Sequence, residues 1–458
     1  MIWPVDYLAL LMFVTFIALI FTGLPVGIVL GGVSVIFGFL GIIFDVFAPI
    51  QFYNLVVRMY AGVASNQVLV AIPMFIFMGT ILERSGVAEE LLKSLQLVMR
   101  RVPGGLAMAV TLMGTILAAT TGIVGASVVM LSLIALPTML QSGYSRQLAS
   151  GTIASAGTLG ILIPPSIMLI IMGDLLQVPV GVLFAGAVLP GLVLSGLYIL
   201  YIGVNAYFRP HTAPPPPPSD ENLSTSQLLS QLARALVPPT VLIGLVLGSI
   251  FFGYATPTEA SGVGCAGALL LAAIKGRLGR KNLALMIDAA ARTNGMVFLI
   301  TLTATAFAYT FRALGGDDAV VQLLGMFGID TPWRLLIFVM VLVFLLGFFF
   351  DWLEICLIVL PIFGPILAQG DFSDYLGTQA AFLPWFLILV AVNLQTSFLT
   401  PPFGFALFYM KGVMPDTLQL IDIYKGIIPF VLLQLTALAL SIVFPDLVLW
   451  LPRYLGLF

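Results

Sequence analysis

Gly157-Thr-Leu-Gly-Ile-Leu-Ile-Pro-Pro-Ser166 interrupts a long apolar stretch, and Asn393-Leu-Gln-Thr-Ser-Phe-Leu-Thr-Pro-Pro-Phe-Gly404 interrupts another in the same way. A proline lacks the amide hydrogen that a helix needs and disfavours helical geometry in the residue before it. Each double proline therefore predicts a helix that is broken in its middle. The first prolines of the two pairs, Pro164 and Pro401, stand 237 residues apart (401 minus 164), so the pattern favours two copies of one unit.

Other landmarks recur at nearly the same spacing. Thr22–Pro25 matches Tyr254–Pro257 at an offset of 232, Arg84–Gly86 matches Arg312–Gly315 at 228 to 229, and Pro137 matches Pro361 at 224. With the double prolines, these matches keep the same order in both halves, which is typical of an internal repeat. We therefore assign residues 1–208 to a first repeat and residues 234–458 to a second.

The composition shows that water is not the main solvent of this surface. Of the 458 residues, 60% are hydrophobic and 8% are charged, with a mean hydropathy of +1.14, whereas soluble domains carry about 25% charged residues. A helix needs about 20 apolar residues to cross the roughly 30 Å hydrocarbon core of a bilayer, and apolar runs approaching that length recur along the chain. The sequence predicts an all-α polytopic membrane protein.

The apolar stretches predict about five transmembrane helices in each repeat. Two further stretches have double length with a polar break, and each predicts either a re-entrant hairpin or two full crossings; they lie at about 105–141 and 332–369. The helices broken by the double prolines lie at about 148–173 and 380–412. Shorter mixed segments predict interfacial amphipathic helices, with ordinary loops as the alternative. These segments are Ile50–Ser65, Val87–Arg101, Lys281–Arg292 and Asp317–Phe327.

A polar connector, residues 209–233, separates the repeats. It contains five consecutive prolines, Pro214–Pro218, which favour extended polyproline geometry, so we expect a spacer outside the membrane. The single histidine, His211, lies in this connector and is not expected to be catalytic.

The basic residues predict the orientation. If each repeat crosses five times and each hairpin returns to its own side, fourteen Lys and Arg residues gather on one side, and Arg58, Arg312, Arg334 and Arg453 remain on the other. The positive-inside rule makes the first side cytoplasmic and places both termini outside. An odd number of crossings in each repeat makes the two repeats inverted, as in many secondary transporters. A hairpin and a pair of crossings have the same parity, so charge does not distinguish them.

The breaks are the candidate binding sites, because broken helices at the midplane free backbone carbonyls and amides. Freed carbonyls and hydroxyls are the oxygen ligands that a hard cation prefers, and a helix N-terminus can hold a carboxylate. The alternative is a structural kink without a ligand. Asp351, after three phenylalanines in the second double-length stretch, is a functional candidate at membrane depth; the alternative is an interfacial residue in a simple turn.

Five stretches spread over nearly the whole chain resemble the large membrane subunit of tripartite ATP-independent periplasmic (TRAP) transporters, a branch of the ion transporter superfamily. The stretches are Ala71–Gly79, Ser85–Val87, Gly160–Ser166, Thr256–Ala260 and Thr400–Gly404. The resemblance implies a scaffold domain, a moving elevator domain with two hairpins, and coupling to sodium ions. It also implies a small four-helix membrane subunit, a periplasmic substrate-binding protein, and a multi-pass location in the bacterial inner membrane. The long Pro-rich connector and the acidic Asp351/Glu354 tip depart from the family pattern.

The resemblance places sodium at the hairpin tips and unwound helices, which assigns residues to two hypothetical sodium sites and a substrate site. The first sodium site comprises Thr121, Gly122, Gly157 and Thr158, and the second comprises Asp351, Gln395, Thr396 and Thr400. The hypothetical substrate site comprises Ser127, Pro164, Pro165, Ser166, Pro401 and Pro402. The substrate is expected to be a small organic anion, such as a carboxylate.

Two other functions are alternatives to a TRAP transporter subunit. A carboxylate symporter or ion antiporter of the same superfamily, working without a binding protein, would share the repeats and the broken helices. A membrane-embedded enzyme is opposed by the sequence, which has no His-Glu-x-x-His or Gly-x-Ser-x-Gly motif. Cys265 and Cys356 have neither metal nor redox spacing.

Overall fold

The computed structural model describes residues 7–121, 124–215, 225–401, 404–415 and 418–457, and these residues form helices and connecting turns with no strand. The first half contains α1 (Leu8–Ile20), α2 (Val26–Ile43), α3 (Ile50–Met59), α4 (Ala71–Arg84), α5 (Val87–Val98), α6 (Gly105–Thr121), α7 (Val124–Gln141), α8 (Arg146–Thr158), α9 (Ile167–Leu175) and α10 (Val180–Phe208). The second contains α11 (Thr225–Phe251), α12 (Pro257–Ile274), α13 (Arg280–Ala313), α14 (Gly316–Met326), α15 (Pro332–Leu346), α16 (Trp352–Ala368), α17 (Ser373–Leu376), α18 (Phe382–Leu399), α19 (Phe405–Val413), α20 (Leu420–Val443) and α21 (Asp446–Tyr454). Short turns complete them: η2 (Tyr60–Ala64), η3 (Val68–Val70), η4 (Leu159–Ile161), η5 (Pro210–Thr212) and η6 (Gln379–Ala381).

The prediction of a polytopic all-α protein is confirmed. Eight of the described helices are long and apolar enough to cross a membrane, and a bent pair, Ile50–Ala64 with Val68–Arg84, would make a ninth. The two parts of this pair meet at 55°. Many large apolar side chains on the outer faces are exposed, for example Ile36 on α2 and Leu270 on α12. Such faces suit contact with lipid chains.

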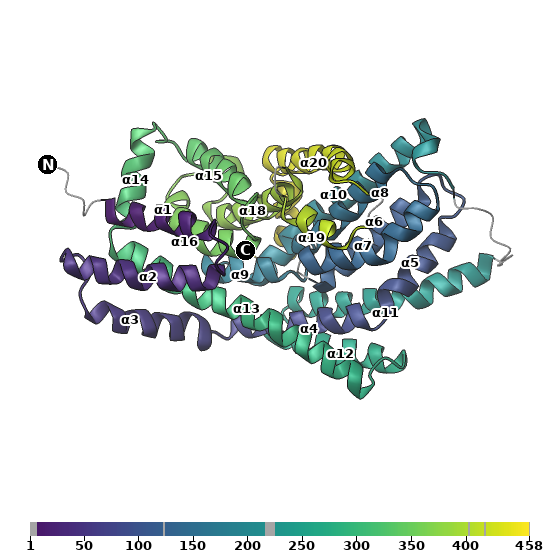
Figure 1. Ribbon diagram of the computed structural model, residues 1–458, viewed down its shortest axis with the longest axis horizontal. Helices are drawn as coiled ribbons and strands as arrows, with labels where there is room; N and C mark the ends of the chain where they lie inside the picture. The colour runs from purple at the N-terminus through teal and green to yellow at the C-terminus, as the bar shows by residue number, and fades with distance from the viewer. Residues whose placement is uncertain (1–6, 122–123, 216–224, 402–403, 416–417, 458) are drawn as a thin grey trace.

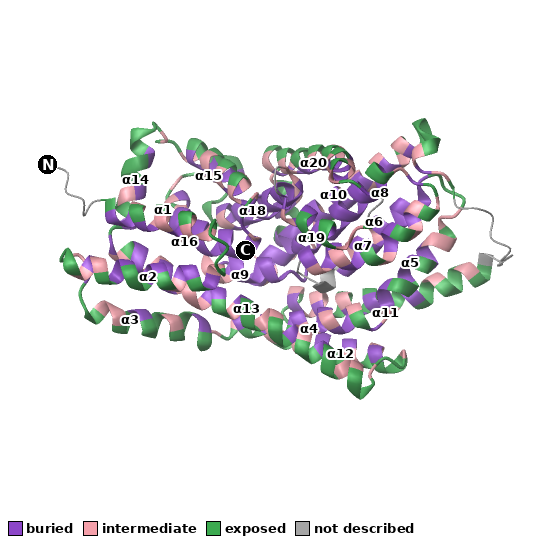
Figure 2. Cartoon of the chain, in the orientation of Figure 1, coloured by how far each residue is buried: buried purple, intermediate pink, exposed green. Residues whose placement is uncertain are grey.

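The helices form two groups that lie side by side. One group is a band in which α2 packs on α13, α13 packs on α4, and α4 packs on α12; it runs along the lower edge of Figure 1. The other group contains the two helix pairs α6/α7 and α15/α16 together with α8, α10, α18 and α20. Figure 2 shows that buried residues are concentrated around α8, α9, α10 and α18, whereas α3, α11 and α12 are largely exposed.

The most buried long segment is the helix before the second double proline. In the most apolar 18-residue window of the span Gln379–Leu399, 94% of the residues are buried inside the protein, although its sequence is as apolar as a lipid-facing helix. The segment therefore lies in the middle of the second group, where protein rather than lipid surrounds it. This position makes its polar side chains candidates for function.

Each double-length stretch folds as two helices joined by a short break. The arms α15 and α16 have 15 and 17 residues, which at 1.5 Å per residue span about 22 and 26 Å. Both lengths are below the roughly 30 Å of a bilayer core. The break between α6 and α7, residues 122–123, lies outside the described residues.

One predicted segment is not separate. Lys281–Arg292 is the first part of α13, a continuous helix of 34 residues, because no proline or glycine pair interrupts it. Helix α11 begins at Thr225, within the predicted connector 209–233. Its leucines at 228, 229, 232 and 236 recur at helical spacing, and this pattern extends the helix into the polar region.

Local sequence explains several helix starts. Gly86 and Gly315, which are matched in the two halves, precede α5 and α14 with φ values of +79° and +77°, a conformation that glycine adopts without strain. Thr256 and Glu259 form a reciprocal capping box at α12. Glu259 is therefore an acid that stabilises the start of α12.

Candidate functional site

The first double proline breaks a buried helix as predicted. α8 ends at Thr158, the turn η4 follows, and α9 starts after Ser166. Pro164 and Pro165 are joined by a cis peptide bond. Because they lack amide hydrogens, they remove the helical partners of the carbonyls four residues earlier, on Gly160 and Ile161. The Ser166 hydroxyl donates to the Ile161 carbonyl at 2.5 Å, so a side chain replaces the helical donor at one of these two carbonyls.

The second double proline ends α18. The Thr400 backbone is extended (φ −88°, ψ 128°), and α19 starts after Gly404, whose φ is +46°. The Thr400 hydroxyl donates to the Thr396 carbonyl at 2.8 Å, and the Thr396 hydroxyl donates to the Val392 carbonyl at 3.0 Å. Both hydroxyls have thereby used their hydrogen, so their oxygens can act only as acceptors.

A single hydrogen bond joins the two broken helices. The Gln395 side-chain amide donates to the Thr158 hydroxyl oxygen at 3.3 Å. Each residue stands six positions before the first proline of its own pair (164 minus 158 and 401 minus 395), so matched positions of the two halves contact each other. Gln395 and Thr158 are fully buried, and the Gln395 Oε1 atom has no hydrogen-bond partner in the described part of the chain.

The second hairpin tip is organised by its two acids. The Asp351 carboxylate accepts from the Trp352 amide at 2.8 Å, and the Glu354 carboxylate accepts from the Asp351 amide at 3.1 Å. They form a capping box at the start of α16, which satisfies amides that would otherwise lack partners. Asp351 is therefore a helix cap.

Both hairpin tips lie against the broken helices. A Cβ placed on Gly347, at the end of α15, would stand 1.9 Å from the Ser397 Oγ atom, and one on Gly125, at the start of α7, would stand 2.7 Å from the Tyr409 ring. Glycine at the two tips thus permits an approach that any other residue would block.

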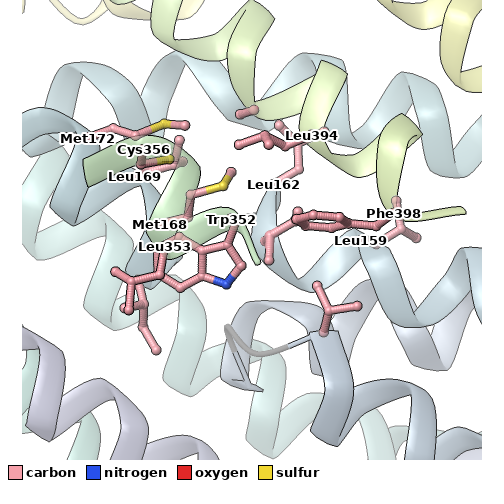
Figure 3. Packing of buried hydrophobic residues seen from close by; sticks show 14 of the residues in the cluster. Leu159, Leu162, Met168, Leu169, Met172, Trp352, Leu353, Cys356, Leu394 and Phe398 are labelled. Atoms are coloured by element: carbon pink, nitrogen blue, oxygen red, sulfur yellow. The ribbon is translucent and has the colours of Figure 1, made fainter. Parts of the chain in front are cut away.

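Apolar packing fixes the same junction. Figure 3 shows Leu162 and Met168, on either side of the first break, beside Trp352 from the second hairpin and near Leu394 and Phe398 of α18. All five side chains are nearly or fully buried. Apolar side chains therefore pack beside the polar groups of the breaks, and an unpaired oxygen is costly in such surroundings.

The structure brings together residues from the two predicted sodium sites. Thr158, assigned to the first site, contacts Gln395, assigned to the second, while Gly157 packs on the backbone of α7 at Val128. Thr121 is the last residue of α6. Ser127, Pro164, Pro165 and Ser166 are buried, and Pro401 is half-buried; Gly122 and Pro402 lie outside the described residues.

Sequence reasoning missed some groups at this junction. The Gly160 carbonyl could have been found by counting four residues back from Pro164, which is the rule for a helical acceptor. Tyr409 carried no such signal, because it is one aromatic residue among many in an apolar helix. Asn393, whose side chain donates to the Met340 carbonyl at 2.6 Å, ties α18 to α15.

The order of elements and the sequence motifs agree with one protein family. Residues 13–447 match the family model described as "Tripartite ATP-independent periplasmic transporter, DctM component". The chain belongs to this family. It is a component of a membrane transporter and not an enzyme, and members of the family work with a small membrane subunit and a periplasmic binding protein.

Individual relatives cover almost the whole chain. The C4-dicarboxylate TRAP transporter large permease protein DctM of Pseudomonas aeruginosa is 28% identical over 414 residues, which is 90% of this chain and 92% of the relative. The ectoine TRAP transporter large permease protein TeaC of Halomonas elongata is 27% identical over 450 residues, 96% of this chain and 98% of the relative. The two relatives are named for different substrates, so family membership leaves the substrate open.

A solved transporter structure shares the fold. The crystal structure of the Alcanivorax borkumensis YdaH transporter, described as having an unusual topology, superimposes with a TM-score of 0.58. It is 15% identical and covers 86% of this chain and 88% of its own. At this identity the likeness concerns the fold alone.

Proposed function

We propose that this chain is the large membrane subunit of a sodium-coupled importer, which takes up a small organic anion delivered by a periplasmic binding protein. The observation that carries the proposal is the contact between Thr158 and Gln395. Two broken helices from opposite halves of the chain meet there, in a buried place that holds an unpaired oxygen. A transporter needs such a junction to bind its coupling ion away from both solutions.

The donor set suits sodium. A hard monovalent cation is best held by neutral oxygens, and the junction offers the Gln395 Oε1 atom, the Thr158 hydroxyl oxygen and the carbonyl of Gly160. Sodium would stabilise the unwound segments in one geometry, which would then present helix-end amides to the substrate. Ser166 before α9 and Ser127 in the first turn of α7 mark two helix N-termini where a carboxylate could be held.

Internal symmetry supports the inverted-repeat part of the proposal. The packing of α2 on α13 is matched by that of α12 on α4, and the packing of α8 on α20 is matched by that of α18 on α10. In each pair the second contact follows from the first when the helices of the two halves are exchanged. A twofold relation between the halves would generate this pattern, and it would bring Thr158 and Gln395 together near its axis.

The elevator mechanism is part of the same proposal. The band of α2, α4, α12 and α13 would be the static scaffold, and the group with both hairpins would move. Movement would have to break the polar contacts between the two groups. Two such contacts are the hydrogen bond from Asn66, between η2 and η3, to Asp174 of α9 at 2.7 Å and the one from Arg312 of α13 to the Pro361 carbonyl of α16.

The proposed orientation places both termini in the periplasm and the connector in the cytoplasm, within a bacterial inner membrane. Cysteines introduced at Ser219 and after Phe458 are expected to react with a membrane-impermeant maleimide from opposite faces in intact cells and inverted vesicles. The buried Cys265 and Cys356 serve as the unlabelled background. Labelling of both sites from the same face would contradict the inverted repeats.

The second expected result separates this function from its alternative, a symporter that works alone. Proteoliposomes that contain this chain, the small subunit and the loaded binding protein should show substrate uptake driven by a sodium gradient. Omitting the binding protein should reduce uptake to the background of empty liposomes, because the large subunit is expected to take substrate from that protein. Rapid uptake of free substrate by this chain alone would favour the symporter, and uptake indifferent to sodium would contradict the coupling.

A further inference from the structure

A polar cavity is lined by none of the residues that form the junction of the broken helices. It has a volume of about 530 Å³ and lies between α3, α9, α13 and α16. Its polar lining comprises Gln51, Arg58, Thr305, Tyr309 and Arg312. Its α16 wall is formed by Leu357 and Pro361, which are one to three helical turns beyond the capping residue Asp351. The volume is that of a small-molecule site.

The charge of this cavity has one sign. Two arginines line it, and none of the described residues that line it is an aspartate or glutamate. Arg58 makes no ion pair with any described residue, and it sits in the last turn of α3 two helical turns after Gln51. Two guanidinium groups that line one cavity create a positive potential, which attracts anions, although Asp317 beside Arg312 offsets part of it.

Arg312 donates a hydrogen bond to a backbone carbonyl of α16 that lacks its helical donor. The carbonyl of Pro361 would normally accept from the amide of residue 365, but that residue is also a proline. Arg312 donates through Nη2 to this carbonyl and pairs through Nε with Asp317 at 3.6 Å. Its Nη1 group has no partner among the described residues, so one side of the guanidinium remains for a ligand.

We propose that this cavity is an anion site, in which Arg58 and Arg312 bind a small molecule or headgroup that bears a carboxylate or phosphate. The two guanidinium groups donate to the anion, and Gln51 and Tyr309 supply further hydrogen bonds. The anion screens the repulsion between the two arginines and lies between the helix band and the second hairpin. The site uses none of the residues assigned to sodium or substrate.

The test uses the full-length protein in phosphatidylcholine nanodiscs and inorganic phosphate as the probe. Potassium phosphate should raise the melting temperature above that in potassium chloride of equal ionic strength, as a ligand of the folded state does. Arg58→Gln and Arg312→Gln should each raise the phosphate concentration for half-maximal effect about tenfold, the value of one charge-assisted hydrogen bond. Arg334→Gln is the matched control, because Arg334 is exposed outside this cavity and pairs with Asp330; it should change that concentration less than about twofold.

A lipid headgroup is distinguished by changing the membrane. In nanodiscs with phosphatidylglycerol, a lipid in the cavity would abolish the effect of free phosphate, and native mass spectrometry would show one retained lipid that Arg58→Gln loses. A free small anion would instead shift the melting temperature equally in both membranes. Either outcome supports the site and names the source. If Arg58→Gln and Arg312→Gln both behave like Arg334→Gln with phosphate and with lipid, the proposal is overturned.

A chemical probe covers the case in which Arg312→Gln fails to fold. Thr305→Cys places a thiol in the cavity wall, where a sulfonate-bearing methanethiosulfonate should react faster than a trimethylammonium one, relative to their rates with free cysteine. Adding Arg58→Gln, which changes an exposed side chain, should lower this ratio about threefold because the local potential falls. An unchanged ratio would count against the anion site. Sodium-dependent stabilisation, measured on the same variants, should stay at the wild-type value and reports separately on the proposed function.

Discussion

Gln395→Leu is expected to raise the sodium concentration that gives half-maximal thermal stabilisation by about tenfold, since it removes one oxygen ligand from an enclosed site. Without sodium the same variant should be about as stable as the wild type. It loses the 3.3 Å hydrogen bond from the Gln395 amide to the Thr158 hydroxyl, but it also removes Gln395 Oε1, which is buried without a hydrogen-bond partner in the described part of the protein, so a lost hydrogen bond and a relieved desolvation cost offset each other. Melting temperature against sodium concentration, with potassium as the reference ion, measures both effects.

Gln434→Leu is the matched control for this result. Gln434 is equally buried, on α20, and its side chain lies beside the Tyr198 hydroxyl without a hydrogen bond of good geometry to any described residue. Neither Gln434 nor Tyr198 belongs to a double-proline break. Replacement of Gln434 should leave the sodium dependence unchanged. If Gln395→Leu also keeps the wild-type sodium dependence while folding normally, the ion-site assignment is wrong, although membership of the family is unaffected.

Gly426→Ala is expected to prevent correct packing of the second helix group. A Cβ on Gly426 would stand 2.1 Å from the Gln147 carbonyl oxygen, and one on Gly151 would stand 2.2 Å from the Gly426 carbonyl oxygen. Both obstacles are backbone atoms, so α8 and α20 must move apart. Overpacking of this kind costs about 1–3 kcal/mol or more, and close contact between small residues is a main source of helix association in membranes. Size-exclusion profiles of heated samples should show an earlier loss of the monodisperse peak.

Gly244→Ala controls for the substitution itself. Gly244 also lies inside a long helix, α11, but a Cβ there meets no atom within 4 Å. Alanine is favoured over glycine in a helix by about 1 kcal/mol, so this variant should be as stable as the wild type or more so. Equal melting behaviour of Gly426→Ala and Gly244→Ala would mean that the crossing of α8 and α20 is not tight in the membrane.

The sequence by itself determined the class of the protein and the positions of its two helix breaks. Apolar run length alone predicted the class of the protein, because the bilayer imposes one length on every spanning helix. The double prolines predicted the breaks, since a missing amide hydrogen acts within four residues of its own position. The match between Pro164 and Pro401 also singled out the segments that meet at the junction. The start of α11 at Thr225 was not predicted, because no proline or glycine there marks a helix boundary.

Only the tertiary structure decided which groups meet. Nothing near Thr158 indicates that its partner is Gln395, because the contact depends on how two helices 237 positions apart (395 minus 158) cross. The local role of Asp351 also came from the structure: its position at the start of α16 makes it a helix cap, while its assignment as a sodium ligand stays a prediction. The cavity of Arg58 and Arg312 joins two helices whose sequences give no sign of each other. Local rules concern atoms within a few residues, whereas the junction and the cavity arise from packing across the whole chain.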